Sequence, residues 1–154
     1  MPSKSSQKTG LRFLKTPKLN TWTEADNEIT LFEEIICLGP CRLVSIDSMI
    51  CAEISGLTSS DSNPSAYNTY RLYIDNVQVC QSGFEAETDE LAPNLANSTL
   101  MWGGNISCKH SIIVKVTAQL TVTVPSESLV SSNVNNSVGN FQGSKGSALR
   151  VLTF

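Results

Sequence analysis

The chain has 154 residues, of which 40% are apolar and 16% are charged, with a net charge of −3. This length suits one domain with a sizeable core. No apolar run is long enough to span a membrane as a helix, and no apolar stretch follows the first lysines, so the sequence predicts neither a membrane protein nor a signal peptide.

The N-terminal segment concentrates positive charge. Residues 1–18 contain five basic residues and no acid, whereas residues 19–154 contain fourteen acids and six bases. Two prolines in the first segment favour an extended path. We therefore expect residues 1–24 to form an extended basic N-terminal arm ahead of a folded domain at residues 25–154.

The arm combines basic with apolar side chains, and this combination predicts that it binds a partner. The candidate contact residues are Lys4, Lys8, Leu11, Arg12, Phe13, Leu14, Lys15, Lys18 and Trp22. Because only one of the five basic residues is an arginine, an acidic protein surface is a better partner for the arm than RNA. The alternative is a solvated, disordered terminus.

The first predicted strands follow the arm. Residues 29–37 form one strand and residues 41–54 a longer one, with a turn between them that contains Gly39 and Pro40. The next segment, residues 55–68, is rich in serine and predicts a surface loop. Because surface loops often carry binding residues, Tyr67 in this loop is the candidate ligand-binding side chain, with a sugar as the ligand.

A hairpin comes next along the chain. Residues 69–82 alternate on both sides of Asp75 and Asn76, two residue types that tolerate the positive φ of a tight hairpin turn. Residues 83–97 are rich in acids and predict a loop. Residues 98–102 predict a short strand.

The longest alternation in the chain spans residues 110–124. The apolar side chains from Ile112 to Val124 fall on one parity, and polar side chains fall on the other with the exception of Ile113. A period of two over this length predicts one strand, or two strands in a hairpin, with one buried and one solvated face. Half-buried strands of this kind belong to antiparallel sheets.

The chain closes with a polar segment at residues 125–146 and a strand at residues 147–154, in which Leu152 and Phe154 share one parity. No segment has a convincing 3.6-residue period. Many short strands divided by turn signals predict an all-β fold, an antiparallel jelly-roll β-sandwich that carries the extended N-terminal arm.

Four pieces of the sequence occur in an order that resembles a known family. They are the hairpin YRLYIDNVQV, a short strand that ends at Trp102, a strand that begins at His110, and the terminal strand LRVLTF. This order, over residues 41–154, resembles the jelly-roll domains of tailed-bacteriophage virion proteins, namely head decoration proteins and fibre tips. Those domains look like the globular heads of complement-type and tumour-necrosis-factor-like proteins. One position departs from the pattern, since Lys109 precedes the histidine where many relatives have glycine.

The resemblance implies a virion protein without enzymatic activity, which is assembled in the host cytoplasm. It also implies a homotrimer, because jelly rolls of this type tend to bury apolar strand faces at a three-fold axis. The candidate residues for that contact are Leu152 and Phe154.

The residue types that carry chemistry do not form a convincing site. His110 is the single histidine, and a zinc site would need it together with Cys108, Cys37 and Cys41. Cysteine in strand-like runs usually packs as a small hydrophobe, and an odd cysteine count favours reduced thiols. The alternative for Cys37 and Cys41 is a disulfide between them, formed in oxidising surroundings. The acids at 85–90 lack the spacing of a calcium loop. We therefore expect no catalytic residue, no metal and no cofactor.

Three functions without catalysis stay open. The favoured one is a capsid decoration or cement protein, which docks on the major capsid protein through its arm and stabilises the shell. The second is a receptor- or glycan-binding tip of a tail or head fibre. The third is the coat protein of a small virus, for which five basic residues are few. The expected partners are virion proteins and further copies of the chain, and neither nucleic acid nor a membrane.

Overall fold

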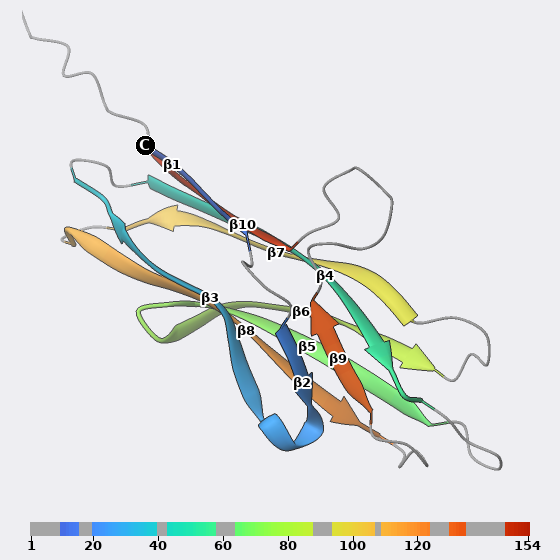
Figure 1. Ribbon diagram of the computed structural model, residues 1–154. Coiled ribbons are helices and arrows are strands. Elements are labelled where there is room, and N and C mark those ends of the chain that lie inside the picture. The colour runs from blue at the N-terminus through green and yellow to red at the C-terminus, as the bar shows by residue number, and fades with distance from the viewer. Residues whose placement is uncertain are drawn as a thin grey trace, which may run out of the picture.

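Alternating apolar and polar side chains give strands in most of the chain, and the computed structural model arranges them in two packed antiparallel sheets (Figure 1). The structure describes residues 10–15, 20–39, 43–57, 64–87, 94–106, 109–123, 130–134 and 147–154. The strands within these ranges are β1 (Gly10–Lys15), β2 (Asn20–Thr23), β3 (Glu28–Cys37), β4 (Leu43–Ser55), β5 (Ser65–Ile74), β6 (Val77–Glu87), β7 (Asn94–Asn105), β8 (Ser111–Val122), β9 (Ser131–Val134) and β10 (Ala148–Thr153).

The strands pair as one long hairpin that has been rolled up. From the inside of the sequence outwards, β5 pairs with β6, β4 with β7, β3 with β8, β2 with β9 and β1 with β10, all antiparallel. Rolling brings β9 and β10 against β4, and β8 against β5. Nested pairing of this kind produces a jelly roll, a double-sheet way of managing open strand edges. The predicted all-β, antiparallel jelly-roll sandwich is confirmed.

The rolled hairpin forms two sheets. Sheet A has the order β1-β10-β4-β9-β2, and β7 pairs with the other edge of β4. Sheet B has the order β3-β8-β5-β6. The strand β4 is long enough to pair with β10 through Val44–Met49 and with β9 through Ala52–Ser55. It therefore joins the two halves of sheet A.

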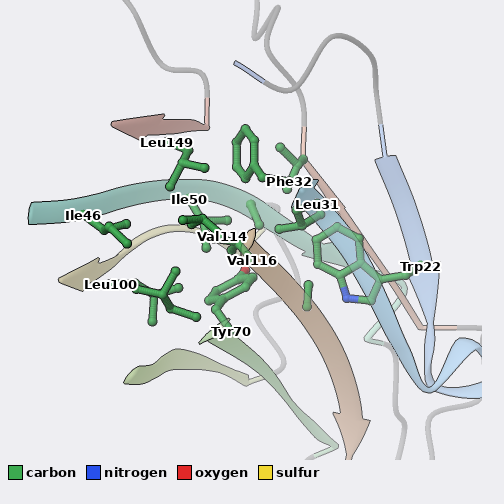
Figure 2. Close-up of a cluster of buried hydrophobic side chains, with 14 of the residues drawn as sticks. Trp22, Leu31, Phe32, Ile46, Ile50, Tyr70, Leu100, Val114, Val116 and Leu149 are labelled. Atoms are coloured by element: carbon green, nitrogen blue, oxygen red, sulfur yellow. The ribbon is translucent and has the colours of Figure 1, made fainter. Parts of the chain in front are cut away.

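The inward side chains of both sheets fill one core. Ile46 and Ile50 of β4 face Tyr70 of β5 and Val116 of β8 across the sandwich (Figure 2). Each large apolar side chain that is fully buried stabilises the fold by about 1.5–3 kcal/mol. In β3 the register shifts between Thr30 and Phe32, and this irregularity turns two consecutive apolar residues, Leu31 and Phe32, into the core. The alternation before and after them consequently has different parity.

Several predicted elements are confirmed and others are longer than expected. Residues 111–122 form one strand, β8, and not a hairpin. The turn between β5 and β6 has Asp75 and Asn76 at φ 49° and 67°, as the hairpin prediction requires. The predicted acidic loop is shorter than 83–97, because β6 continues to Glu87 and β7 begins at Asn94. Acidic residues fit an outward-facing strand position as well as they fit a loop, so charge alone did not separate the two.

The predicted arm contains two strands of sheet A. The backbone of β1 pairs with the whole of β10, and β2 pairs with β9. Trp22 in β2 has 0% of its surface exposed and belongs to the core of this chain (Figure 2). It is therefore corrected from a candidate partner contact to a core residue, because a large indole ring gains most from burial. Residues 1–9 and 16–19 lie outside the described residues.

A short 3-10 helix, η1 (Glu24–Asp26), carries the chain from sheet A to sheet B. The Asp26 carboxylate accepts hydrogen bonds from the Thr23 N–H at 2.6 Å and from the Thr23 hydroxyl at 3.0 Å. The Glu24 carboxylate accepts the N–H of Val122 at 3.2 Å, where β8 extends beyond its pairing with β3. In the part of the chain that the structure describes, no helix is long and apolar enough to cross a membrane.

Candidate interaction surface

The outer face of sheet A carries large apolar side chains, although the inner face of the same sheet already fills the core. In β4, Val44 and Ile46 point inward, so the residues between and beside them point outward. Leu43 is 53% exposed and Met101 of β7 is 69% exposed. Met49 and Phe154 are also exposed on this face. The solvent-facing side of a half-buried sheet normally carries polar side chains, so the large apolar residues on this face are unusual.

The strand register places these side chains in two pairs, Leu43 with Phe154 and Met49 with Met101, on either side of Asp47. Leu43 and Phe154 lie opposite each other, with N–H to O distances of 2.9 Å and 3.4 Å in the two directions. Met101 lies opposite Asp47, which in turn lies opposite Arg150 of β10. Met49 is two residues along β4 and therefore on the same face. We call the outward side chains of β4, β7 and β10 together the sheet A face.

An ion pair lies in the middle of the sheet A face. Arg150 donates from Nε to Asp47 Oδ1 and Oδ2 at 3.1 Å and 3.0 Å, and from Nη2 to Oδ2 at 2.8 Å. These hydrogen bonds and the charge of the carboxylate raise the pKa of the Arg150 guanidinium. Because the pair is exposed, it contributes little to stability, and its main effect is to place one charge of each sign at the centre of an apolar surface.

The residues predicted for the trimer contact lie on this face. Phe154 is 41% exposed and Leu152 is half-buried, with Ser45 opposite Leu152 on β4. The backbone of β1 lies on the other side of β10, with Leu11 opposite Leu152 and Phe13 opposite Arg150. The predicted arm and the predicted oligomer contact are thus neighbours in one sheet.

The remaining arm residues are placed only in part. The backbone of Arg12 lies opposite Val151, that of Leu14 opposite Leu149, and that of Lys15 opposite Ala148. The predicted contact residues Lys4, Lys8 and Lys18 lie outside the described residues.

Sequence reasoning missed Leu43, Met49 and Met101. The signal that could have found them is a large apolar residue on the parity that a strand otherwise gives to polar residues. Leu43 and Met49 have this pattern in β4 and Met101 has it in β7. Trp102, which follows Met101, points inward and is partly buried against the core.

The outer face of sheet B carries the exposed apolar residues Ile35 and Ile113, which lie opposite each other, and a polar cluster that centres on Glu28. Its Oε1 accepts hydrogen bonds from the Tyr73 hydroxyl at 2.9 Å and from the Thr117 hydroxyl, and lies 3.4 Å from Nη1 of Arg71. Partial burial raises the pKa of Glu28, but the two hydroxyl donors and the arginine outweigh it, so the pKa lies below the ordinary value. Burial and the hydrogen bond to Glu28 raise the pKa of Tyr73.

Tyr67, the predicted ligand-binding residue, lies in β5 and not in a loop. It is 37% exposed on the outer face of sheet B. A Cβ atom at Gly83 of β6 would lie 3.0 Å from both Cε1 and Oη of Tyr67, so the ring occupies the space above that glycine.

The cysteines do not form a site in the described parts of the chain. Cys37 is exposed, Cys51 is buried and Cys80 is half-buried. Cys41 and Cys108, which the zinc alternative also needs, lie outside the described residues. No group of three or more histidine, cysteine, aspartate or glutamate side chains that could hold a metal ion occurs among the residues that the structure covers.

Solved structures with a similar arrangement include viral particles and a bacterial protein. The T13 viral particle of infectious bursal disease virus has a TM-score of 0.45 and 12% identity, over 94% of this chain and 35% of the matched chain. The VP2 subviral particle of that virus has a TM-score of 0.42 and 12% identity, over 95% and 37%. Dimeric latent PorU from Porphyromonas gingivalis has a TM-score of 0.44 and 9% identity, over 94% and 12%.

This chain therefore spans between 12% and 37% of the length of these three solved chains. Likenesses at this identity and TM-score concern the fold and do not assign a function. No protein-family model and no curated protein sequence matches the chain.

Proposed function

We propose that this protein is a non-enzymatic structural subunit of a virus particle, which associates with copies of itself through the sheet A face. The observation that carries the proposal is the exposure of Leu43, Met49, Met101 and Phe154 on one face of a sheet whose other face already completes the core. A contiguous exposed apolar patch commonly marks a surface that another protein covers.

The association would gain mainly from burial of apolar surface. Met101 and Leu43 are the most exposed large side chains of the sheet A face and would lose the most water-accessible surface. The central ion pair of Asp47 and Arg150 would favour one orientation of the partner, since a misplaced copy would leave charge against apolar surface. The resemblance to complement-type heads makes three copies the proposed number.

The finer proposal is a bacteriophage capsid decoration or cement protein. Its support comes from the sequence resemblance and from the basic and apolar residues at the N-terminus. The backbone of β1 pairs with β10 and so lies beside the sheet A face. The proposed role of the basic N-terminal residues is to dock on an acidic surface of a major capsid protein.

Light scattering on the purified protein, without other virion proteins, tests the self-association. At about 10 μM we expect the wild type to be a trimer and Met101→Glu to be a monomer, because an unpaired charge in the contact would weaken association by about tenfold or more. Val77→Glu is the matched control, since Val77 is 64% exposed at the start of β6 in sheet B. A monomeric wild type, or a Met101→Glu protein that stays a trimer, would contradict the proposal.

Cryo-electron microscopy of purified particles tests the location. A decoration protein should be found across the capsid lattice. Density for the protein only at the tail would favour the fibre tip, and its absence from particles would refute a virion role.

A further inference from the structure

The Tyr67 ring lies beside Gly83, where a Cβ atom would approach the Asn68 carbonyl oxygen to 2.1 Å and the ring to 3.0 Å. The two residues lie diagonally across the β5–β6 pair, since Tyr67 is opposite Glu85 and Gly83 is opposite Thr69. The ring lies over the bare backbone of Gly83, which supports one of its sides, while 37% of the residue stays exposed. The hydroxyl of Tyr67 has no hydrogen-bond partner among the described residues. An aromatic ring in this position offers an apolar platform with a polar edge to a ligand.

A row of fixed polar groups continues from the ring along β5. Thr69 and Arg71 share the outward parity of Tyr67, and Arg71 is about 13 Å from it along the strand at 3.3 Å per residue. Arg71 donates from Nη1 to Oε1 of Gln119 at 2.9 Å. Its Nε and Nη2 groups, and the amide nitrogen of Gln119, have no acceptor among the described residues. The Arg71 guanidinium is therefore held in place by Gln119, and its Nε and Nη2 groups can donate to a ligand.

The charge along this row is balanced. Arg71 lies 3.4 Å from the Glu28 carboxylate, whose lowered pKa keeps it ionised at neutral pH. Glu85, opposite Tyr67, adds one negative charge, and Lys115, opposite Tyr73, adds one positive charge. A strip with this balance offers a polyanion no net attraction. A neutral ligand that presents both apolar C–H faces and hydroxyl groups matches the ring, the amide and the guanidinium.

We propose that the strip formed by Tyr67, Gln119 and Arg71 on the outer face of sheet B binds a neutral oligosaccharide. One sugar ring would stack on Tyr67, and hydroxyl groups of the following sugars would hydrogen-bond to Gln119 and Arg71. The strip lies on the opposite layer of the sandwich from the sheet A face, so it stays accessible when copies associate. The proposal goes beyond the structural role and does not depend on it.

Calorimetric titration with maltohexaose, cellohexaose and chitohexaose, each at up to about 5 mM, tests the proposal on the full chain. At least one of the three should bind with a dissociation constant of about 1 mM or tighter. Tyr67→Ala should weaken that binding about tenfold, because it removes the platform. Tyr67→Phe should bind within about threefold of the wild type, since the stacking does not need the hydroxyl group.

Thr99→Ala in β7, on the opposite layer, is the control and should bind like the wild type. A heparin hexasaccharide tests the ligand class and should not bind. The proposal fails if none of the three neutral hexasaccharides binds, if Tyr67→Ala binds as well as the wild type, or if heparin alone binds. Circular dichroism of Tyr67→Ala distinguishes a lost platform from a lost fold.

Discussion

At the scale of single residues, the turn between β5 and β6 shows how local chemistry reaches across the molecule. Asp75 and Asn76 both adopt positive φ, which tight two-residue hairpins require. The Asp75 carboxylate accepts the N–H of Ile113 at 2.8 Å and forms an ion pair with Lys109. The Asp75 N–H donates to the Ile113 carbonyl at 2.9 Å. The turn is therefore fastened to the start of β8.

The positive φ of Asn76 predicts that alanine and glycine at this position differ in their effect on stability. Asn76→Ala should destabilise the fold by about 1–2 kcal/mol, because alanine resists the left-handed conformation. Asn76→Gly should be neutral within about 0.5 kcal/mol, since glycine adopts this conformation freely but loses an exposed hydrogen bond to Lys115. Urea unfolding measures both, and equal stability of the two variants would show that the turn is not strained.

The Asp75 carboxylate predicts a pH dependence of stability. The hydrogen bond from Lys109, the Ile113 N–H and the charge of Lys109 lower its pKa below the ordinary value of 3.8. Its contribution to the free energy of unfolding is therefore complete above that value and is lost as pH falls through the folded-state pKa. Asp75→Asn keeps an oxygen for Ile113 but cannot ionise.

The wild type should consequently be more stable than Asp75→Asn near pH 6, and the difference should shrink below about pH 4. Urea unfolding at a series of pH values measures it. A difference that stays constant down to pH 2, about two units below the ordinary pKa, would exclude this ionisation as the cause.

At the scale of elements, a buried polar chain ties the two sheets together at β2. The indole N–H of Trp22 donates to Asn68 Oδ1 at 3.2 Å, and Asn68 Nδ2 donates to the Ser132 hydroxyl at 2.6 Å. The Ser132 hydroxyl in turn donates to the Glu53 carbonyl at 3.1 Å. One side chain each from β2, β5 and β9 is therefore satisfied, which is what buried polar groups require.

This connection predicts different outcomes for two N-terminal truncations. Removing residues 1–15 deletes β1, an outer strand, and should leave a cooperative unfolding transition. Removing residues 1–23 also deletes Trp22 and should destabilise the domain by about 3–5 kcal/mol more, as truncation of buried aromatic residues does.

Thermal unfolding followed by circular dichroism compares the two truncated chains. Trp22→Phe in the full chain is the control, because it keeps an aromatic ring in the core but removes the N–H that Asn68 Oδ1 accepts and part of the buried volume, with an expected loss of about 1–3 kcal/mol. If both truncated chains unfold at the same temperature, β2 is not the anchor that its burial implies.

At the scale of the whole molecule, the two outer faces differ in chemistry and imply different partners. The sheet A face presents large apolar side chains around one ion pair, whereas the outer face of sheet B combines a polar network around Glu28 with the exposed residues Ile35 and Ile113. The proposed self-association uses the first face and the proposed sugar contact uses the second. A sandwich separates these two surfaces by the thickness of its core.

The difference predicts how salt acts on assembly. Raising NaCl from about 0.1 M to about 1 M shortens the screening length from about 10 Å to about 3 Å. Self-association through the sheet A face should persist, because apolar burial drives it. Docking of the basic N-terminal residues on a capsid surface should weaken only partly, since apolar side chains accompany the charges. Light scattering and co-sedimentation with particles measure the two effects, and dissociation of the trimer by salt would point to charge as the main cause.

The sequence by itself determined the strand content, the hairpin turn at Asp75 and Asn76, and the buried parity of β8. These properties depend on side-chain alternation and on the φ preference of single residues, which act between near neighbours. It also placed Leu152 and Phe154 on one parity, but it could not show what lies beside them. The polar β9, with its Ser and Asn residues, was missed because its pairing with β4 and β2 leaves no apolar pattern of its own.

Only the tertiary structure decided that Trp22 lies in the core and that Leu43, Met101 and Phe154 lie on one face. This face depends on strand pairings between residues that are far apart in the chain, which arise from rolling up the long hairpin. The same holds for the space over Gly83 that the Tyr67 ring occupies. Alternation tells which residues of a strand share a face, but the strand order decides whether that face meets the core, water or another molecule.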